Sequence, residues 1–148
     1  MEKLYAKERA ATYESYKKYQ QSYYPEWKPE YEQFVKAQAE PLRKPGFDSI
    51  AWVNAVTYQM IYEQPVIYEI KNITVPTLLI IGDADRTIAG KNLLSDSVKA
   101  VHGLYPQLAQ QVKEKITGCR LIMTAGVGHI PHIQEPEKFK EALNSFLQ

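Results

Sequence analysis

Two short, mainly apolar runs at residues 77–81 and 120–124 constrain most strongly what this chain can fold into. Neither run alternates between apolar and polar residues, which is typical of strands covered on both faces, as in a parallel sheet. Residues 91–116 between them have a helical pattern with a break near 103–106, and a last helix is expected near Pro136. Because parallel strands are joined by a crossover, commonly a helix, we predict an α/β fold with two parallel strands and flanking helices.

Residues 1–70 differ in composition from the rest of the chain, and their pattern predicts helices. Ten of the 11 tyrosines and both of the 2 tryptophans lie in this part, and the tyrosines from 13 to 23 recur at helical spacing. The expected helices run from about residue 3 to 23, from Pro29 to about 39, and from a cap at Asp48 or Ser49 to Pro65. We therefore predict a helical region at 1–70 and an α/β region at 71–148.

Two strands do not make a stable sheet. An isolated pair is marginal in water, and a parallel pair expects a neighbouring strand on at least one edge. We therefore expect these 148 residues to contain only part of a sheet. The missing partner would be the other half of the core, and the isolated chain is expected to self-associate.

The balance of charged residues bears on which partners the chain can be expected to bind. Eighteen basic and 17 acidic side chains leave a net charge of +1, which indicates neither nucleic acid nor an anionic membrane surface as a partner. No apolar stretch is long enough to span a membrane, and the first residues do not resemble a signal peptide. If the other half of the core carries a signal peptide, the protein is periplasmic or secreted; otherwise a cytoplasmic location is expected. The single cysteine, Cys119, precedes an apolar run and is interpreted as a small buried hydrophobic residue.

Polar residues follow both predicted strands. Asp83 and Asp85 come directly after the first strand, and His129 follows the second. Carboxyl ends of parallel strands lie at one edge of a sheet, where α/β folds place ligands and catalytic groups. A carboxylate at one ring nitrogen fixes the tautomer of a histidine, so that the other nitrogen can take a proton from a nucleophile. His132 is interpreted as a solvent-facing or pocket-lining residue, and His102 as a residue on the surface of a helix.

The sequence VPTLLIIGDAD at 75–85 resembles the strand that carries the acid in α/β-hydrolases. GHIP at 128–131 and EPEKF at 135–139 resemble the histidine loop and final helix of that family. The resemblance is strongest from residue 75 to the end, and it implies Asp85 as the triad acid, with Asp83 as the rival, and His129 as the base. It also implies that residues 1–70 are the helical cap, whose tyrosines pack within the cap or line a substrate pocket.

The nucleophile of that family is absent. None of the serines lies in a Gly-x-Ser-x-Gly turn, and no oxyanion-loop motif is present. The resemblance therefore implies the C-terminal part of a hydrolase acting on an ester or similar acyl compound, with no metal or organic cofactor. Its nucleophile would be serine, or aspartate in a dehalogenase or epoxide hydrolase. The alternatives are a non-catalytic binding or assembly module on this scaffold, and a tyrosine-rich helical interaction domain fused to a small α/β unit.

Overall fold

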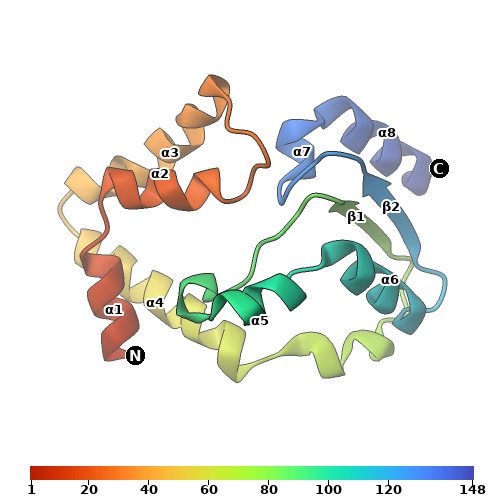
Figure 1. Cartoon of the computed structure of the whole chain (residues 1–148), viewed down its shortest axis with the longest axis horizontal. Coiled ribbons are helices and arrows are strands. Elements are labelled where there is room, and N and C mark those ends of the chain that lie inside the picture. Colours follow the sequence, from red (N-terminus) through yellow and green to blue (C-terminus); the bar gives the residue numbers. More distant parts are fainter. The chain divides into compact units, whose positions relative to one another are not determined.

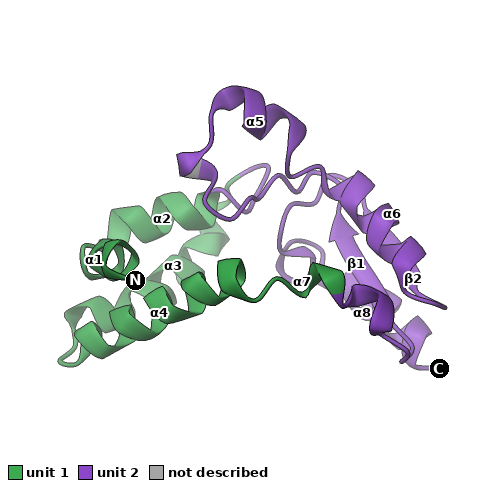
Figure 2. Ribbon diagram, turned by 90° about the horizontal axis from the view of Figure 1, so that it is seen from below, with its two compact units in different colours: residues 1–21, 27–68 green, residues 22–26, 69–148 purple. Residues whose placement is uncertain are grey.

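The computed structural model describes residues 1–148 apart from the side chain of Asn92. The chain divides into two compact units, one of residues 1–21 and 27–68 and the other of residues 22–26 and 69–148 (Figure 2). The sequence placed a single boundary near residue 70. It did not indicate that residues 22–26, inside the helical part, belong to the α/β unit.

The first unit is helical. Its helices are α1 (Glu2–Arg9), α2 (Tyr13–Gln21), α3 (Glu32–Ala39) and α4 (Phe47–Glu63), with short 3-10 turns at Pro29–Tyr31, Glu40–Arg43 and Val66–Tyr68. Its core contains Tyr16, Val35 and Ala39, against which Trp27 and Leu42 pack. The rings of Tyr5 and Trp52 also pack in a T-shaped arrangement, with centroids 5.2 Å apart, which connects α1 to α4.

The single helix expected over residues 3–23 is in fact two helices. Thr12 and Ser15 cap the start of α2 reciprocally: the Ser15 N–H donates to Thr12 Oγ1 at 3.1 Å, and the Thr12 N–H donates to Ser15 Oγ at 2.9 Å. Such a pair satisfies N–H groups that a helix start leaves unbonded, so it favours a new helix over continuation of α1.

The predicted cap of α4 is also wrong. The helix begins after Gly46, whose φ of 88° suits glycine, and no side chain caps it. The Asp48 carboxylate instead pairs with Arg9 at 2.7 Å and accepts a hydrogen bond from the Tyr5 hydroxyl at 2.5 Å. Contacts between α1 and α4 therefore take the carboxylate that was expected to cap the helix.

The second unit has the α/β arrangement. Strands β1 (Leu78–Gly82) and β2 (Arg120–Thr124) pair in parallel, from Leu78 opposite Arg120 to Gly82 opposite Thr124. The chain between and after them forms α5 (Asp96–Val101), α6 (Tyr105–Lys115), α7 (Pro131–Gln134) and α8 (Pro136–Leu147), with 3-10 turns at Ile70–Asn72 and Lys91–Leu93. Helices α6 and α8 lie on opposite sides of the strand pair (Figure 1). The fold class is thus α/β, with two parallel strands and a helical region before them.

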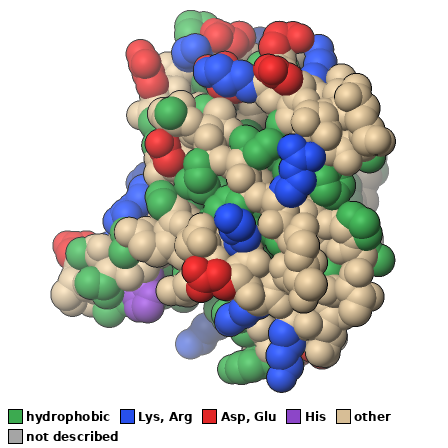
Figure 3. Space-filling model, turned by 90° about the vertical axis from the view of Figure 1, so that its right-hand side faces the viewer, with side chains coloured by type: hydrophobic (Ala, Val, Ile, Leu, Met, Phe, Trp, Pro, Cys, Tyr) green, Lys and Arg blue, Asp and Glu red, His purple; other side chains and the backbone are tan. Residues whose placement is uncertain are grey.

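The strands are less covered than their apolar sequences predict. Four of the five residues of β1 are half-buried, and Met123 of β2 is 38% exposed. Cys119, expected to be buried, is also only half-buried. On the face in Figure 3, apolar side chains are interspersed with basic and acidic ones. Within the described residues, no helix is both long and apolar enough to cross a membrane.

Candidate acid and histidine site

The loops that follow the two strands bring Asp85 and His129 together. His129 Nδ1 lies 2.7 Å from Asp85 Oδ2, which is the contact expected from the sequence. Because β1 and β2 are parallel neighbours, both loops leave the same edge of the sheet, and main-chain hydrogen bonds join them directly. The Asp83 N–H donates to the Thr124 carbonyl at 3.1 Å, and the Ala84 N–H donates to the Val127 carbonyl at 2.9 Å.

Glycines allow these segments to approach closely. A Cβ on Gly82 would lie 2.2 Å from the carbonyl oxygens of Val127 and Gly128. A Cβ on Gly128 would lie 2.2 Å from the carbonyl oxygen of Tyr23. Both distances are far below van der Waals contact, so the two loops and residues 22–26 pack backbone against backbone only because glycine occupies both positions.

The Asp85 carboxylate is buried but well supplied with donors. Asp85 as a whole is 5% exposed. Oδ1 accepts hydrogen bonds from the Thr87 N–H and the Thr87 hydroxyl, each at 2.8 Å. Burial alone raises the pKa of this carboxyl, but the hydrogen bonds from His129 and Thr87 outweigh it and hold the pKa below its usual value. Asp85 therefore stays ionised at neutral pH.

Two aromatic rings flank the imidazole of His129. The ring of Tyr23 lies 4.8 Å from it, tilted by 37°, and the ring of Tyr105 meets it edge-on at 6.2 Å. The backbone N–H of His129 donates to the Tyr23 carbonyl at 2.8 Å, which fixes the backbone of the loop. With Nδ1 held by the carboxylate, Nε2 is the nitrogen that can exchange a proton with another group, and the side chain is 39% exposed.

The rival acid and His132 have other partners. Asp83 Oδ1 accepts a hydrogen bond from the Gly126 N–H at 2.7 Å, so this carboxylate holds the loop after β2. His132 packs against Phe139, with ring centroids 5.7 Å apart. Among the described residues, no group of three or more His, Cys, Asp or Glu side chains is placed to hold a metal ion.

Three residues of this site were not identified from the sequence: Thr87, Tyr105 and Tyr23. Thr87 is two residues beyond Asp85, a spacing at which a carboxylate commonly bonds the following backbone, so it could have been suspected. Nothing in the sequence links Tyr23 or Tyr105 to His129, because both contacts arise only when distant segments pack.

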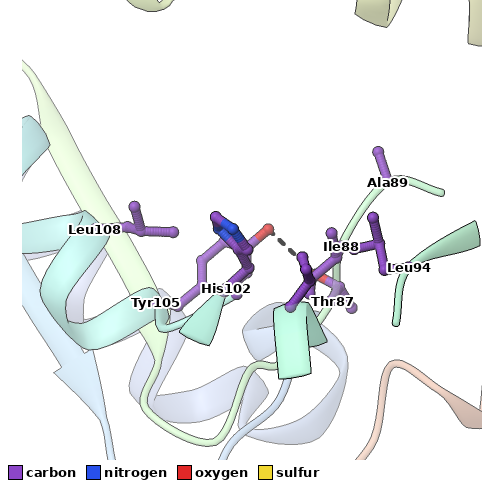
Figure 4. A pocket seen from close by; sticks show the side chains of 9 residues that line it. Thr87, Ile88, Ala89, Leu94, His102, Tyr105 and Leu108 are labelled. Atoms are coloured by element: carbon purple, nitrogen blue, oxygen red, sulfur yellow. Dashed lines mark hydrogen bonds between the residues drawn. The ribbon is translucent and has the colours of Figure 1, made fainter. Parts of the chain in front are cut away.

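A cavity of about 410 Å³ adjoins the site (Figure 4). The hydroxyls of Thr87 and Tyr105, 3.2 Å apart, lie in its wall, and the side chains of Leu94, His102 and Leu108 also line it. Because Thr87 Oγ1 lies 3.0 Å from Nδ1, this cavity borders the carboxylate side of the imidazole.

Comparison with known proteins agrees with the α/β fold. No family model matches the chain, and no curated protein matches it. The crystal structure of a probable hydrolytic enzyme from Pseudomonas aeruginosa PAO1 is similar to it, with 39% sequence identity and a TM-score of 0.91. The match covers 98% of this chain and 47% of that one, so the chain spans about half the length of this neighbour.

Proposed function

We propose that this chain supplies the acid and the base of a nucleophile–histidine–acid triad in an α/β-hydrolase that cleaves an ester or a similar acyl compound. The observation that carries the proposal is the 2.7 Å contact between Asp85 Oδ2 and His129 Nδ1, made by loops at the carboxyl ends of two parallel strands. The similarity to a probable hydrolytic enzyme supports the hydrolase class.

In the proposed reaction, His129 is the general base and then the general acid. Nε2 takes the proton of a hydroxyl nucleophile as its oxygen attacks the carbonyl carbon, and the imidazolium returns that proton to the departing alkoxide. Asp85 holds the tautomer with the proton on Nδ1 and stabilises the imidazolium. Water then attacks the acyl intermediate, with Nε2 again accepting the proton. The nucleophile would come from outside residues 1–148, because no serine here has the required turn.

A chimera tests the proposal directly. Residues 1–148 replace the matched part of the Pseudomonas enzyme, and turnover of p-nitrophenyl acetate is measured beside that of the parent enzyme. We expect His129→Ala and Asp85→Asn to lower kcat by on the order of 10⁴-fold, since each removes a member of the triad.

The matched control is Asp83→Asn. Its side-chain oxygen can still accept the hydrogen bond from Gly126, so kcat should stay near that of the unsubstituted chimera. Turnover that survives His129→Ala would contradict the proposal. A chimera that melts cooperatively but does not hydrolyse esters would favour a non-catalytic binding or assembly module.

The 148-residue chain alone gives a second test. Without a nucleophile and an oxyanion loop, it should not turn over p-nitrophenyl acetate in a way that depends on His129. Saturable hydrolysis that is lost in the His129→Ala chain would show that a nucleophile lies within these residues.

A further inference from the structure

The two oxygens of the Asp85 carboxylate have separate partners. Oδ2 faces Nδ1 of His129 at 2.7 Å, whereas Oδ1 receives both the N–H and the hydroxyl of Thr87 at 2.8 Å. The torsion about the Cβ–Cγ bond of aspartate is broad and its two ionised oxygens are equivalent, so the side chain alone does not fix the plane of the carboxylate. Two donors from one residue on one oxygen hold that plane so that the other oxygen faces the histidine.

The direction of the hydrogen bonds follows from counting protons. The Thr87 hydroxyl lies within hydrogen-bond distance of the Asp85 carboxylate at 2.8 Å, of His129 Nδ1 at 3.0 Å and of the Tyr105 hydroxyl at 3.2 Å, but it has one proton to give. A carboxylate is the stronger acceptor, so Thr87 donates to Asp85, and the Tyr105 hydroxyl can donate to Thr87 Oγ1. Tyr105 thereby favours the rotamer of the threonine hydroxyl that points its proton at the acid.

We propose that Thr87 is a positioning residue, whose hydroxyl holds Oδ1 of Asp85 so that Oδ2 faces Nδ1 of His129. Its role for catalysis rests on the proposed function, but the contacts belong to this chain alone. Threonine suits the task because its β-branch restricts rotation about χ1 and thereby keeps the hydroxyl in place. The structure separates this role from simple packing, since the hydroxyl makes the contacts with Asp85, His129 and Tyr105.

Carboxyl titration of the 148-residue chain tests the inference without any need for activity. With ¹³C-labelled aspartate, NMR measures the pKa of Asp85 in the unsubstituted chain and in Thr87→Val, Thr87→Ala and Thr87→Ser. Valine keeps the shape and loses the hydroxyl, whereas serine keeps the hydroxyl and loses the methyl group. We expect the pKa of Asp85 to rise in the valine and alanine variants, because a hydrogen bond that favours the ionised form is lost, and to stay low with serine.

The opposite ranking would overturn the inference. If serine raises the pKa of Asp85 as much as valine does, the methyl group matters and Thr87 is only a packing residue. An unchanged pKa in whichever of the valine and alanine variants folds, as judged by circular dichroism, would also overturn it. An inactive chimera would defeat the hydrolase proposal and leave this ranking intact, so the two failures are distinguishable.

Discussion

Asp85 and Asp83 are separated by a single residue and have different tasks because the backbone presents them to different partners. Asp83 accepts the Gly126 N–H and ties one loop to the other, whereas Asp85 turns to His129 and Thr87. The difference in burial follows the same division: Asp85 is 5% exposed and depends on its donors to remain charged.

Stability should depend on the ionisation of Asp85. Its folded-state pKa lies below the usual value of about 3.9, so ionised Asp85 contributes stability above that pH, and the contribution is lost as pH falls through the folded-state pKa. We expect the urea concentration at the midpoint of unfolding to decrease as the pH is lowered below about 4. The decrease should be smaller in Asp85→Asn. Urea titrations from pH 2 to 7 measure this, with Asp83→Asn as the control, which should retain the steep fall. Parallel curves for Asp85→Asn and the unsubstituted chain would contradict the prediction.

At the level of elements, the junction after β1 depends on glycine at position 82, which has no side chain. Gly82 ends the strand where the carbonyls of Val127 and Gly128 pass 2.2 Å from the position of a Cβ. These atoms belong to backbone that the sheet register and the His129 loop already hold, so they have little room to move.

Gly82→Ala should therefore be strongly destabilising. We expect a loss of about 3 kcal/mol or more, since overpacking against backbone cannot be relieved by a change of rotamer. Gly118→Ala is the control: its φ of 73° costs about 1–2 kcal/mol, but no atom lies near its Cβ position. Thermal melts followed by circular dichroism compare the two variants. Equal losses in melting temperature would show that the close approach does not limit this position.

The helical unit has its own test in two valines. Val35 of α3 is fully buried, whereas Val53 of α4 is 59% exposed. Val35→Ala removes two buried methyl groups and leaves a cavity, which should cost roughly 2 kcal/mol, and Val53→Ala should cost less than about 0.5 kcal/mol. Denaturant unfolding measures both. Similar values would mean that the packing around Tyr16 and Val35 is not the core of this unit.

For the whole molecule, the exposed apolar surface points to self-association. In the part of the chain that the structure describes, each of the two strands is paired on one side only. Large apolar side chains are also exposed in the second unit, among them Val75 at 64%, Leu93 at 80% and Leu147 at 72%. Unpaired strand edges and apolar patches are surfaces on which proteins associate.

We therefore expect the isolated chain to form dimers or larger assemblies. Light scattering after gel filtration, at several loading concentrations, should give a mass that rises with concentration. Ammonium sulfate should strengthen the association, because it favours burial of apolar surface. A monodisperse monomer of 17.0 kDa at every concentration would mean that these residues satisfy their own core.

Sequence patterns predicted the elements whose cause is local. The run at 120–124 forms β2 as expected, the first strand is displaced by one residue, and the last helix begins at Pro136. The pairing of Asp85 with His129 followed from the same patterns, since two parallel neighbouring strands must release their chains at one edge of the sheet.

The remaining features depended on contacts between distant segments. Asp48 forms an ion pair with Arg9 and does not cap α4, because the packing of α1 on α4 brings a charged partner close. Residues 22–26 lie in the α/β unit because the missing Cβ of Gly128 leaves space for the Tyr23 carbonyl. Tyr105 reaches the Thr87 hydroxyl only because the start of α6 comes beside the loop after β1. Hydrophobic periodicity reports which face of an element is buried, whereas a hydrogen-bond network requires side chains from several elements to meet within about 3 Å, and this happens only in the folded chain.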